Sequence, residues 1–420
     1  MRLKTAGSGV KLPPTVFFLC ALLPTVGFGV DQSSLEKVLD AVDASPGIEL
    51  QRIQFQIKSL QVDDSRNALS PIVELKASQN FLESDNFNEP SDLTLSVRKP
   101  IHTWGALESK ILAAEIDQEA SRLAVEAVRM QVRRQAIENY FAAVVSVRIL
   151  DHLSAATETL KQYEDLIRNR VQQQVSPKID LELVVSRLAR NEAKRIEISR
   201  QLEDARTQIR QLTGVSVDRF EVPLCHPASQ VVRDREVAIG LARQNSSHLR
   251  YLESVVASQS EMMTAIRQGR LPQVDIGVEL QSDEYSSRPE YGGFVSLNYQ
   301  FKGSENQIAL FQQETRVREA RIALEMQERQ LTAEIEVLLN RLSVGSDHVE
   351  ALSQVLVSKE EEVASFFKQF GVGKRKWDSV LSASYELTDA RIELEQETWK
   401  HCMAKHVLSE LTSENTLRAQ

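Results

Sequence analysis

Two long stretches of the chain lack helix-breaking residues, and their apolar positions recur with a helical period. Proline is absent between Pro100 and Pro177 and again after Pro289, and glycine is absent from residues 106–213. Because a proline inside a helix costs about 3 kcal/mol, such gaps permit helices of unusual length. The pattern predicts a helix over residues 106–173, about 100 Å long. Its apolar residues recur at the spacings of a coiled-coil seam, namely Ala120, Leu123, Ala127, Met130, Ile137, Phe141 and Val144.

Three further helices follow from the same criteria. A second long helix is predicted over residues 304–370, although Gly345 interrupts its pattern. Shorter helices are predicted over residues 179–212 and 379–411, each directly after a long one. The last keeps the coiled-coil seam at Ala383, Leu387, Ala390, Leu394, Ala404, Leu408 and Leu411. Each long helix and the short helix after it therefore form a predicted hairpin, with inter-helix turns at residues 172–178 and 371–376.

Four short segments alternate apolar and polar residues and predict strands. Their apolar positions are Val73, Leu75 and Ala77, then Leu93, Leu95 and Val97, then Val274, Ile276, Val278 and Leu280, and finally Val295, Leu297, Tyr299 and Phe301. Period-two alternation places one face of a strand against an apolar environment and the other against water. The two pairs flank polar loops at residues 79–91 and 282–292, as the hairpins of a membrane barrel do.

The alternative to a barrel is a small soluble sheet packed against helices. Helices this long and charged leave little core to cover such a sheet, so the barrel is favoured. In the barrel interpretation Leu297 and Tyr299 face lipid, whereas Ser296 and Asn298 face the lumen. Two strands in each half cannot close a barrel, and an open sheet in lipid leaves backbone groups unpaired at several kcal/mol each. Strands that span a membrane therefore imply oligomerisation.

The order helix, strand, loop, strand, long helix, short helix occurs twice, about 200 residues apart. Pro71 before the first strand, for example, corresponds to Pro272 before the third. The chain opens with basic residues, a short apolar run and a small-residue pair around Phe28, which is typical of a cleaved export signal. The predicted organisation is a signal peptide over residues 1–29, a first repeat over 30–214, a linker over 215–234, a second repeat over 235–414 and a tail over 415–420.

Composition narrows the class of protein. The net charge of −9 disfavours a general nucleic-acid binder, which requires a basic face. The seven histidines are scattered, and Cys402 with His406 is the one metal-like pair at helical spacing, too few ligands for a zinc site. No metal, nucleotide or nucleophile motif predicts an enzyme or a cofactor. Cys20 follows Leu19, unlike a lipidation site, and Cys225 and Cys402 either pair or stay free, alternatives that remain open at this point.

Several segments, in this order and duplicated, resemble the TolC family of outer-membrane factors. They are the opening SLEKVLDAVDASPGIEL, the junction LSVRKPIHTWG, the strand LPQVDIGVEL, and the closing segments that contain KIDLELVVSRLARNEAKR and WDSVLSASYELTDARIEL. The resemblance covers nearly all of the chain after the signal. It implies a mainly α protomer with a small membrane β-part and four strands per chain. It also implies a homotrimer, with a shared 12-stranded barrel in the outer membrane and an α-barrel tunnel of coiled-coil hairpins in the periplasm.

The resemblance also implies a function and partners. The chain is expected to be the exit duct of a tripartite efflux or type I secretion system. Its partners are then a periplasmic membrane-fusion adaptor and an inner-membrane transporter, which supplies the energy, and the barrel contacts outer-membrane lipid. Two alternatives stand beside this function: a structural periplasmic coiled-coil protein without a pore, and a periplasmic adaptor. The strands and the duplication disfavour the first, and two repeated hairpins disfavour the second.

The family's functional residues lie at the hairpin turns. The resemblance implies a periplasmic gate at Asp180, Arg375, Asp378 and Ser379, and adaptor docking at Gln174, Val175, Ser176, Phe370, Gly371, Gly373 and Lys374. This sequence departs from the family's glycine and aspartate pattern in two places. Gln174 stands where glycine is usual, and Ser379 stands where aspartate is usual, with Asp378 one residue earlier. Asp180 is expected to form an acidic ring around the entrance, or alternatively to stabilise the start of its helix.

Overall fold

The computed structural model describes residues 35–78, 92–223, 225, 232–283, 289–300 and 303–412, all in one compact unit, Gln32–Gln420. The predicted signal peptide, the loop at residues 79–91, Phe301 and the C-terminal tail lie outside the described residues. The first repeat contains α1 (Leu35–Asp40), the 3-10 helix η1 (Ala41–Ala44), α2 (Pro46–Asn67), β1 (Ile72–Ser78), β2 (Asp92–His102), α3 (Ala106–Gln172) and α4 (Lys178–Thr213). The second contains α5 (Arg235–Asn245), α6 (Ser247–Gln268), β3 (Gln273–Asp283), β4 (Glu290–Asn298), α7 (Ser304–Gly371) and α8 (Trp377–Thr412).

The long helices form as the pattern of helix breakers predicts. α3 has 67 residues and α7 has 68, so each is about 100 Å long. The shorter helix α4 ends where Gly214 takes φ +74° and donates its backbone N–H to the carbonyl of Arg210. α7 continues through Gly345 instead of stopping there. A Cβ at Gly345 would lie 2.8 Å from the Nδ1 of His401, so the glycine gives α8 room to approach.

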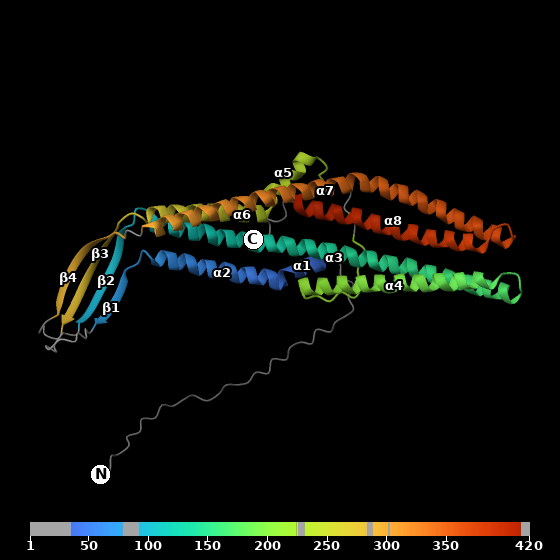
Figure 1. Cartoon of the computed structure of the whole chain (residues 1–420), viewed down its shortest axis with the longest axis horizontal. Coiled ribbons are helices and arrows are strands. Elements are labelled where there is room, and N and C mark those ends of the chain that lie inside the picture. Colours follow the sequence, from blue (N-terminus) through green and yellow to red (C-terminus); the bar gives the residue numbers. More distant parts are fainter. Residues whose placement is uncertain are drawn as a thin grey trace, which may run out of the picture. The chain divides into compact units, whose positions relative to one another are not determined.

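A four-stranded antiparallel sheet, in the order β1-β2-β3-β4, joins the two repeats. The two predicted hairpins are thus one sheet, because β2 of the first repeat pairs with β3 of the second. Figure 1 shows the sheet at one end of the long helices, with the two helix–helix turns at the other end. The predicted fold class, mainly helical with a small sheet, is confirmed.

The register gathers the predicted apolar positions of the four strands on one face, whereas Ile72 and Phe294 lie on the other. Leu95 lies opposite Leu75 on one side and Leu280 on the other, and Leu280 in turn lies opposite Tyr291. These side chains are uncovered: Leu75 is 67% exposed and Tyr291 is 88% exposed. The other face carries Ser96 and its neighbours across the sheet, Glu74 and Glu279.

The end of β4 corrects the expected position of Tyr299. β4 ends at Asn298, so Tyr299 lies beyond the strand rather than on its lipid face. Leu297 is on the apolar face, but it pairs with Val274 close to the helical end of the sheet. The middle of the apolar face is at Leu95, between Leu75 and Leu280.

The strand–helix junctions need backbone conformations that favour glycine. Before α3, Trp104 and Gly105 have φ of +55° and +86°, and a Cβ on Gly105 would lie 3.0 Å from the side chain of Gln268. The indole Nε1 of Trp104 donates to the carbonyl of Pro272, at 2.6 Å, which connects this junction to the start of β3. Gly303 has φ +49° at the equivalent position before α7. Both long helices therefore leave the sheet through a left-handed residue.

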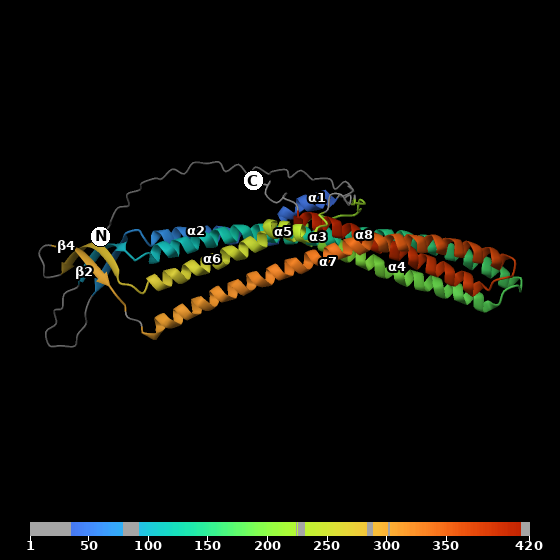
Figure 2. The ribbon, with the colours of Figure 1, turned by 90° about the horizontal axis from the view of Figure 1, so that it is seen from above.

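Coiled-coil packing buries the predicted seam of α3. Six of its seven predicted positions are buried, and Met130 is half-buried. Figure 2 shows α7 diverging from α6 toward the sheet and meeting α8 toward the turns. Where α6 lies between α3 and α7, polar bonds hold the helices together: Ser258 donates to the carbonyl of Ala113, and Gln313, which is 1% exposed, donates to the carbonyl of Gln259. In the described part of the chain, no helix has both the length and the apolar character of a membrane span.

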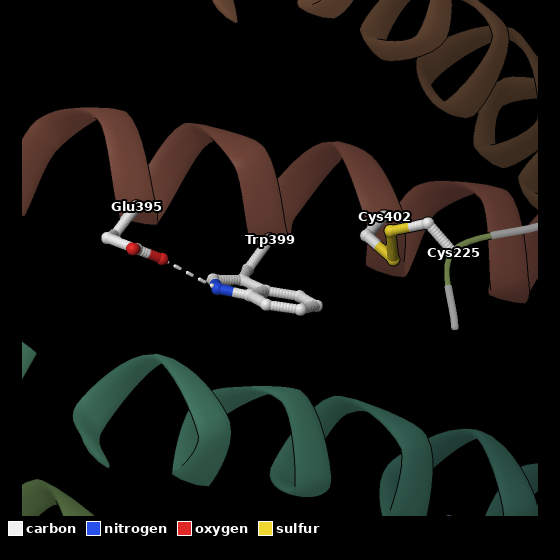
Figure 3. Close-up of a disulfide and its surroundings, with 4 residues drawn as sticks. All are labelled: Cys225, Glu395, Trp399 and Cys402. Atoms are coloured by element: carbon white, nitrogen blue, oxygen red, sulfur yellow. Dashed lines mark hydrogen bonds between the residues drawn. A yellow bond between two sulfur atoms is a disulfide. The ribbon is translucent and has the colours of Figure 1, made fainter. Parts of the chain in front are cut away.

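The linker between the repeats packs onto the helices and is fixed by a disulfide. Phe220 contacts the ring of Tyr140, with 5.3 Å between ring centroids, and Tyr140 donates its hydroxyl to the carbonyl of Glu221. Cys225 then forms a disulfide with Cys402 on α8, with the Cα atoms 5.3 Å apart. Figure 3 shows this bond beside Trp399, whose Nε1 donates to Glu395 on the preceding turn. Of the two alternatives for the cysteines, the structure has the paired one.

Replacing both cysteines, as Cys225→Ser with Cys402→Ala, should lower the free energy of unfolding by about 2–4 kcal/mol. The bond closes a sequence separation of 177 residues, so its loss frees the unfolded chain and releases the linker from α8. Thermal unfolding of the purified protein measures the change, and a reductant should leave the variant's Tm unaffected. A variant as stable as the parent contradicts this prediction.

Candidate functional site

The two hairpin turns have the same backbone hydrogen bonds. In the first turn the N–H of Val175 donates to the carbonyl of Arg170, at 2.8 Å. In the second, the N–H of Lys374 donates to the carbonyl of Gln369, at 2.9 Å. The two turns lie 199 residues apart in sequence, because α3 and α7 end at Gln172 and Gly371. A duplicated sequence therefore folds into two copies of one tight turn.

One position in each turn is left-handed. Gly373 has φ +73°, and the equivalent residue Gln174 has φ +60° although it carries a side chain. A non-glycine residue is uncommon in this region, because its Cβ crowds the following carbonyl. The departure from glycine at Gln174 thus does not change the turn. Gln174 in the first hairpin therefore has a strained backbone, whereas Gly373 adopts the same conformation in the second hairpin without strain.

An aromatic cluster beneath the turns joins the two hairpins of the protomer. Tyr163 of α3 stacks on Phe367 of α7 at 5.6 Å between ring centroids, and it meets Trp377 of α8 edge-on at 5.1 Å. Phe370 packs on Trp377 at 5.0 Å. Burial raises the pKa of Tyr163, whose hydroxyl is bonded to Ser384. Aromatic pairs at such distances contribute about 0.5–1.5 kcal/mol beyond area burial, so the cluster holds the tips of both hairpins together.

Two arginines lie on this cluster. The guanidinium of Arg170 is 4.7 Å from the ring centroid of Phe370, and its Nε donates to the hydroxyl of Ser176. The guanidinium of Arg375 is 3.6 Å from the ring centroid of Phe366. Such cation–π contacts add about 0.5–1 kcal/mol at exposed sites and more where water is excluded. Among the described residues, no carboxylate lies within ion-pair distance of Arg375. A gate role for Arg375 stays a prediction.

Two of the predicted gate acids interact electrostatically. Burial raises the pKa of Asp180, the positive charge of Arg170 lowers it, and the negative charge of Asp378 raises it again, for a net increase. Asp180 is half-buried in the first turn of α4, and Asp378 is exposed in the first turn of α8. The carboxylates of the two hairpins therefore come near one another within one protomer. Ser379, the remaining residue of the predicted gate, follows Asp378 and is half-buried.

The alternative role for Asp180, as a stabiliser of its helix start, has limited support. The N-cap of α4 is Pro177, and no side chain makes the capping hydrogen bond. Asp180 itself donates its backbone N–H to the carbonyl of Pro177, as the first turn of a helix does. Its raised pKa means that the surroundings disfavour the charged carboxylate, which a helix N-terminus would favour.

The predicted docking residues divide into exposed and buried sets. Exposed residues of the set are Gln174, Val175, Gly371, Gly373 and Lys374, while Ser176 is half-buried. Phe370 is 7% exposed and belongs to the aromatic cluster. In the protomer its ring therefore packs the tip, and a part for it in docking stays a prediction.

Below the tips, α4 and α8 make two polar contacts between the hairpins. Arg187 lies 4.7 Å from the ring centroid of Tyr385, and Lys194 pairs with Asp389 at 2.8 Å. Asn191, which is 6% exposed, holds α4 to α3 by donating to the carbonyl of Leu153. In the residues that the structure describes, no group of three or more His, Cys, Asp or Glu side chains is arranged to hold a metal ion.

Comparison with known proteins supports the predicted class. A family model described as "Outer membrane efflux protein" matches residues 40–215. The match covers most of the predicted first repeat. The predicted resemblance is confirmed at this level, and none of the curated proteins compared with the chain matches its sequence.

Solved structures extend the likeness of fold to both repeats. The outer membrane channel CmeC of Campylobacter jejuni is 14% identical, with a TM-score of 0.78 over 96% of this chain and 94% of that one. The outer membrane protein VceC of Vibrio cholerae is 15% identical, with a TM-score of 0.78 over 90% and 95%. The open state of the MtrE outer membrane channel of Neisseria gonorrhoeae is 14% identical, with a TM-score of 0.71 over 90% and 88%. The chain has the fold of these outer-membrane channels.

Some tip residues of this efflux protein fold were not predicted from the sequence. Arg170 contacts the ring of Phe370, donates a hydrogen bond to Ser176 and lowers the pKa of Asp180 through its charge. In the sequence, however, it is one of several arginines on a charged helix. Val372 is 69% exposed beside the left-handed Gly373. Tyr163 and Trp377 lie 214 positions apart, so their contact has no local signal. The aromatic residues near both turns were the one available indication that the tips pack on each other.

The shared turn predicts different costs for two glycine substitutions in one hairpin. Gly373→Ala places a side chain at φ +73° and should lower the free energy of unfolding by about 1–2 kcal/mol. Gly371→Ala is the matched control: it is helical, nothing lies within 4 Å of an added Cβ, and it should be neutral or slightly stabilising. Denaturation midpoints of the purified variants measure both. Equal destabilisation by the two would argue against a left-handed requirement at Gly373.

Proposed function

We propose that this chain is one protomer of a homotrimeric exit duct, in which the sheet contributes to an outer-membrane barrel and the hairpins form a periplasmic tunnel. The tunnel receives substrate from an inner-membrane transporter through a periplasmic adaptor that docks at the hairpin tips. The family of the first repeat and the fold of the whole chain support the outer-membrane efflux class. The trimer, the partners and the location go beyond this class and are part of the proposal.

The observation that carries the proposal is the uncovered apolar face of the sheet. On this face Val73, Leu75, Val278 and Val295 are each more than half exposed, at 66%, 67%, 58% and 70%. A contiguous apolar surface of this kind on a soluble domain would be covered by helices or by a partner. Here the opposite face is polar, with Glu74, Ser96 and Glu279 in one row. Apolar outside and polar inside is the pattern of a membrane barrel.

The sheet edges require further copies of the chain. Within the described residues, β1 pairs with β2 alone and β4 pairs with β3 alone. Their outer edges hold unpaired backbone N–H and C=O groups, which lipid cannot satisfy. Pairing β4 of one protomer with β1 of the next removes both edges, and three protomers close a barrel of twelve strands.

Two helices carry exposed apolar stripes that suit the same contact. On α2 the stripe is Leu50, Ile53, Ile57 and Leu60, which are 54%, 45%, 42% and 67% exposed. On α7 it is Ile308, Phe311, Ile322 and Met326, which are 55%, 70%, 51% and 67% exposed. Steps of three and four on α2, and of three, eleven and four on α7, place each set on one face of its helix. We assign these stripes to the helical contacts between protomers, below the strand pairs.

A pair of arginine substitutions in β2 tests the orientation of the sheet. Leu95 lies at the centre of the apolar face, where arginine at the membrane midplane costs about 2–4 kcal/mol. Ser96 faces Glu74 and Glu279 on the polar side, where arginine gains acidic neighbours. Leu95→Arg should therefore abolish most assembly, whereas Ser96→Arg should assemble normally. Outer-membrane fractionation with chemical cross-linking measures the trimer yield of each variant.

The two substitutions are at neighbouring positions and add the same charge, so each variant is a control for the other. Equal trimer yields would contradict the orientation, and a soluble monomeric parent would contradict the proposed function itself.

Asp180→Asn tests the acidic entrance. Three copies of Asp180, each near an Asp378, repel one another and attract cations. The variant should lower cation selectivity and weaken block by multivalent cations, measured by single-channel recording in planar bilayers. Asp165→Asn, which removes an exposed carboxylate elsewhere on the first hairpin, is the control and should change neither property.

The same variant has a second readout in stability. The folded-state pKa of Asp180 is raised, so its contribution to stability is greatest at low pH and is lost as pH rises through the raised pKa. At pH 7 Asp180→Asn should leave Tm unchanged or increase it, and any increase should disappear as pH falls toward the ordinary aspartate range. A loss of Tm with unchanged selectivity would favour a helix-stabilising role and remove the ring.

A further inference from the structure

The apolar face of the sheet has a groove where one of its positions lacks a side chain. Every second residue of β4 points to this face, and at Gly293, opposite Val278 on β3, only a hydrogen atom does so. Two hollows of about 440 and 450 Å³ lie along the face, and Val97, Val278 and Gly293 line both of them. The two hollows are therefore one continuous groove, which we call the sheet groove.

The length of the sheet groove suits one hydrocarbon chain. Leu95 and Leu280 lie opposite each other at one end, and Lys99 lies opposite Ile276 at the other. The four residue steps from Leu95 to Lys99 span about 14 Å of an antiparallel strand. One leaflet of a bilayer has a hydrocarbon layer of about 15 Å, half of the whole core. An acyl chain of a lipid can thus follow the groove over most of one leaflet.

The charge at one end of the groove is positive. Among the described strand residues, Lys99 is the one charged side chain that the register places on the apolar face. It is exposed, and no carboxylate of the described residues lies within ion-pair distance of it. The acids Glu74, Glu279 and Asp275 are on the opposite face, although Glu279 also borders the groove. A negative group that reaches Lys99 therefore meets no competing acid on this face.

The position of Lys99 corresponds to the level of lipid headgroups. A lysine on the lipid face costs about 2–4 kcal/mol at the membrane midplane but about 0–1 kcal/mol near the interface. Lys99 lies near the end of β2 that leads into α3, and five residues later Trp104 is 47% exposed with its ring 4.5 Å from that of His102. Tryptophan is enriched where a membrane meets water. Lys99 and Trp104 together mark that boundary.

We propose that the sheet groove binds an anionic phospholipid, with an acyl chain along Val97 and Val278 over Gly293 and the headgroup phosphate on Lys99. The inference rests on the proposed function, in which this face meets lipid, and adds a defined site and the chemistry of its ligand. An anionic headgroup fits better than a zwitterionic one. The positive group of a zwitterion has no acid to pair with on this face, whereas the phosphate pairs with Lys99 in either case.

The test uses purified trimers of the full chain in detergent and two phospholipids with the same acyl chains. Phosphatidylglycerol is the anionic probe and phosphatidylcholine is the zwitterionic one, and native mass spectrometry counts the molecules bound. The trimer should bind three molecules, with phosphatidylglycerol about fivefold tighter, the effect of one lysine close to an anionic lipid. The preference should shrink as salt is raised.

A side chain at Gly293 should close the groove without disturbing the strand. A Cβ there would meet only the carbonyl of Gly277, at 3.7 Å, so Gly293→Val fits. The variant should weaken binding of both lipids by about tenfold, as expected if roughly two methylene groups lose their contact. Gly292→Val is the matched control, because the neighbouring residue points to the polar face and nothing lies within 4 Å of its added Cβ. It should bind both lipids like the parent.

The charge is tested separately from the groove. Lys99→Gln should abolish the preference for phosphatidylglycerol but keep the binding of phosphatidylcholine. Lys76→Gln removes an exposed lysine that lies opposite Thr94 on the polar face, and it should keep the preference. The two pairs of variants thus have different signatures: the glycine pair changes the affinity for both lipids, and the lysine pair changes the preference between them.

Several results would overturn the inference. Equal binding of the two lipids by the parent does so, as does undiminished binding by Gly293→Val. If Gly293→Val no longer trimerises while Gly292→Val does, the groove belongs to a strand of the neighbouring protomer. If inorganic phosphate displaces the lipid completely, the site binds an anion without an acyl chain. A trimer in the outer membrane without lipid preference contradicts the lipid site alone, whereas a soluble monomer contradicts the proposed function.

Discussion

The pairing of β2 with β3 is the contact on which the rest of the structure depends. Among the described residues, it is the one place where a strand of the first repeat bonds to a strand of the second, and it turns two hairpins into one sheet. Both long helices begin directly after a residue with positive φ, at the end of the sheet next to the helices. The sheet therefore sets where both helices begin, and α6 between them adds the bonds of Ser258 and Gln313 to this spacing.

From this shared origin, the helices meet again at the opposite end. The contacts that rejoin them differ in kind: buried seams and polar bonds near the sheet, a disulfide-anchored linker in the middle, and aromatic rings with arginines at the tips. The tip cluster also contains buried aliphatic side chains, among them Ile167, Val184 and Leu381, so the apolar seam continues to the turns.

The sequence predicts those features that depend on local pattern. The long gaps in proline and glycine predicted the helices to within about two residues at each end, as expected for helix termini. Alternation predicted the strands and the apolar face. It did not predict the strand order, because the β2–β3 pairing joins residues some 180 positions apart, nor the end of β4 before Tyr299. The disulfide, the burial of Phe370 and the approach of Asp180 to Asp378 depend on contacts between different helices or between the linker and a helix, which local pattern does not reveal. The family resemblance placed the site at the turns, and the structure adds which of its residues pack there and which face solvent.

The duplicated turn has a consequence for symmetry. In the proposed trimer, six turns with one backbone geometry alternate around the axis, but the left-handed position is glutamine in three of them and glycine in the other three. The backbone of the ring then has nearly sixfold symmetry, whereas its side chains have threefold symmetry. A partner that assembles in six copies would meet two classes of site in alternation, and its subunits would become inequivalent on binding even if they were identical before. A partner in three copies would instead bind one class of turn, and this choice would fix its rotation about the axis.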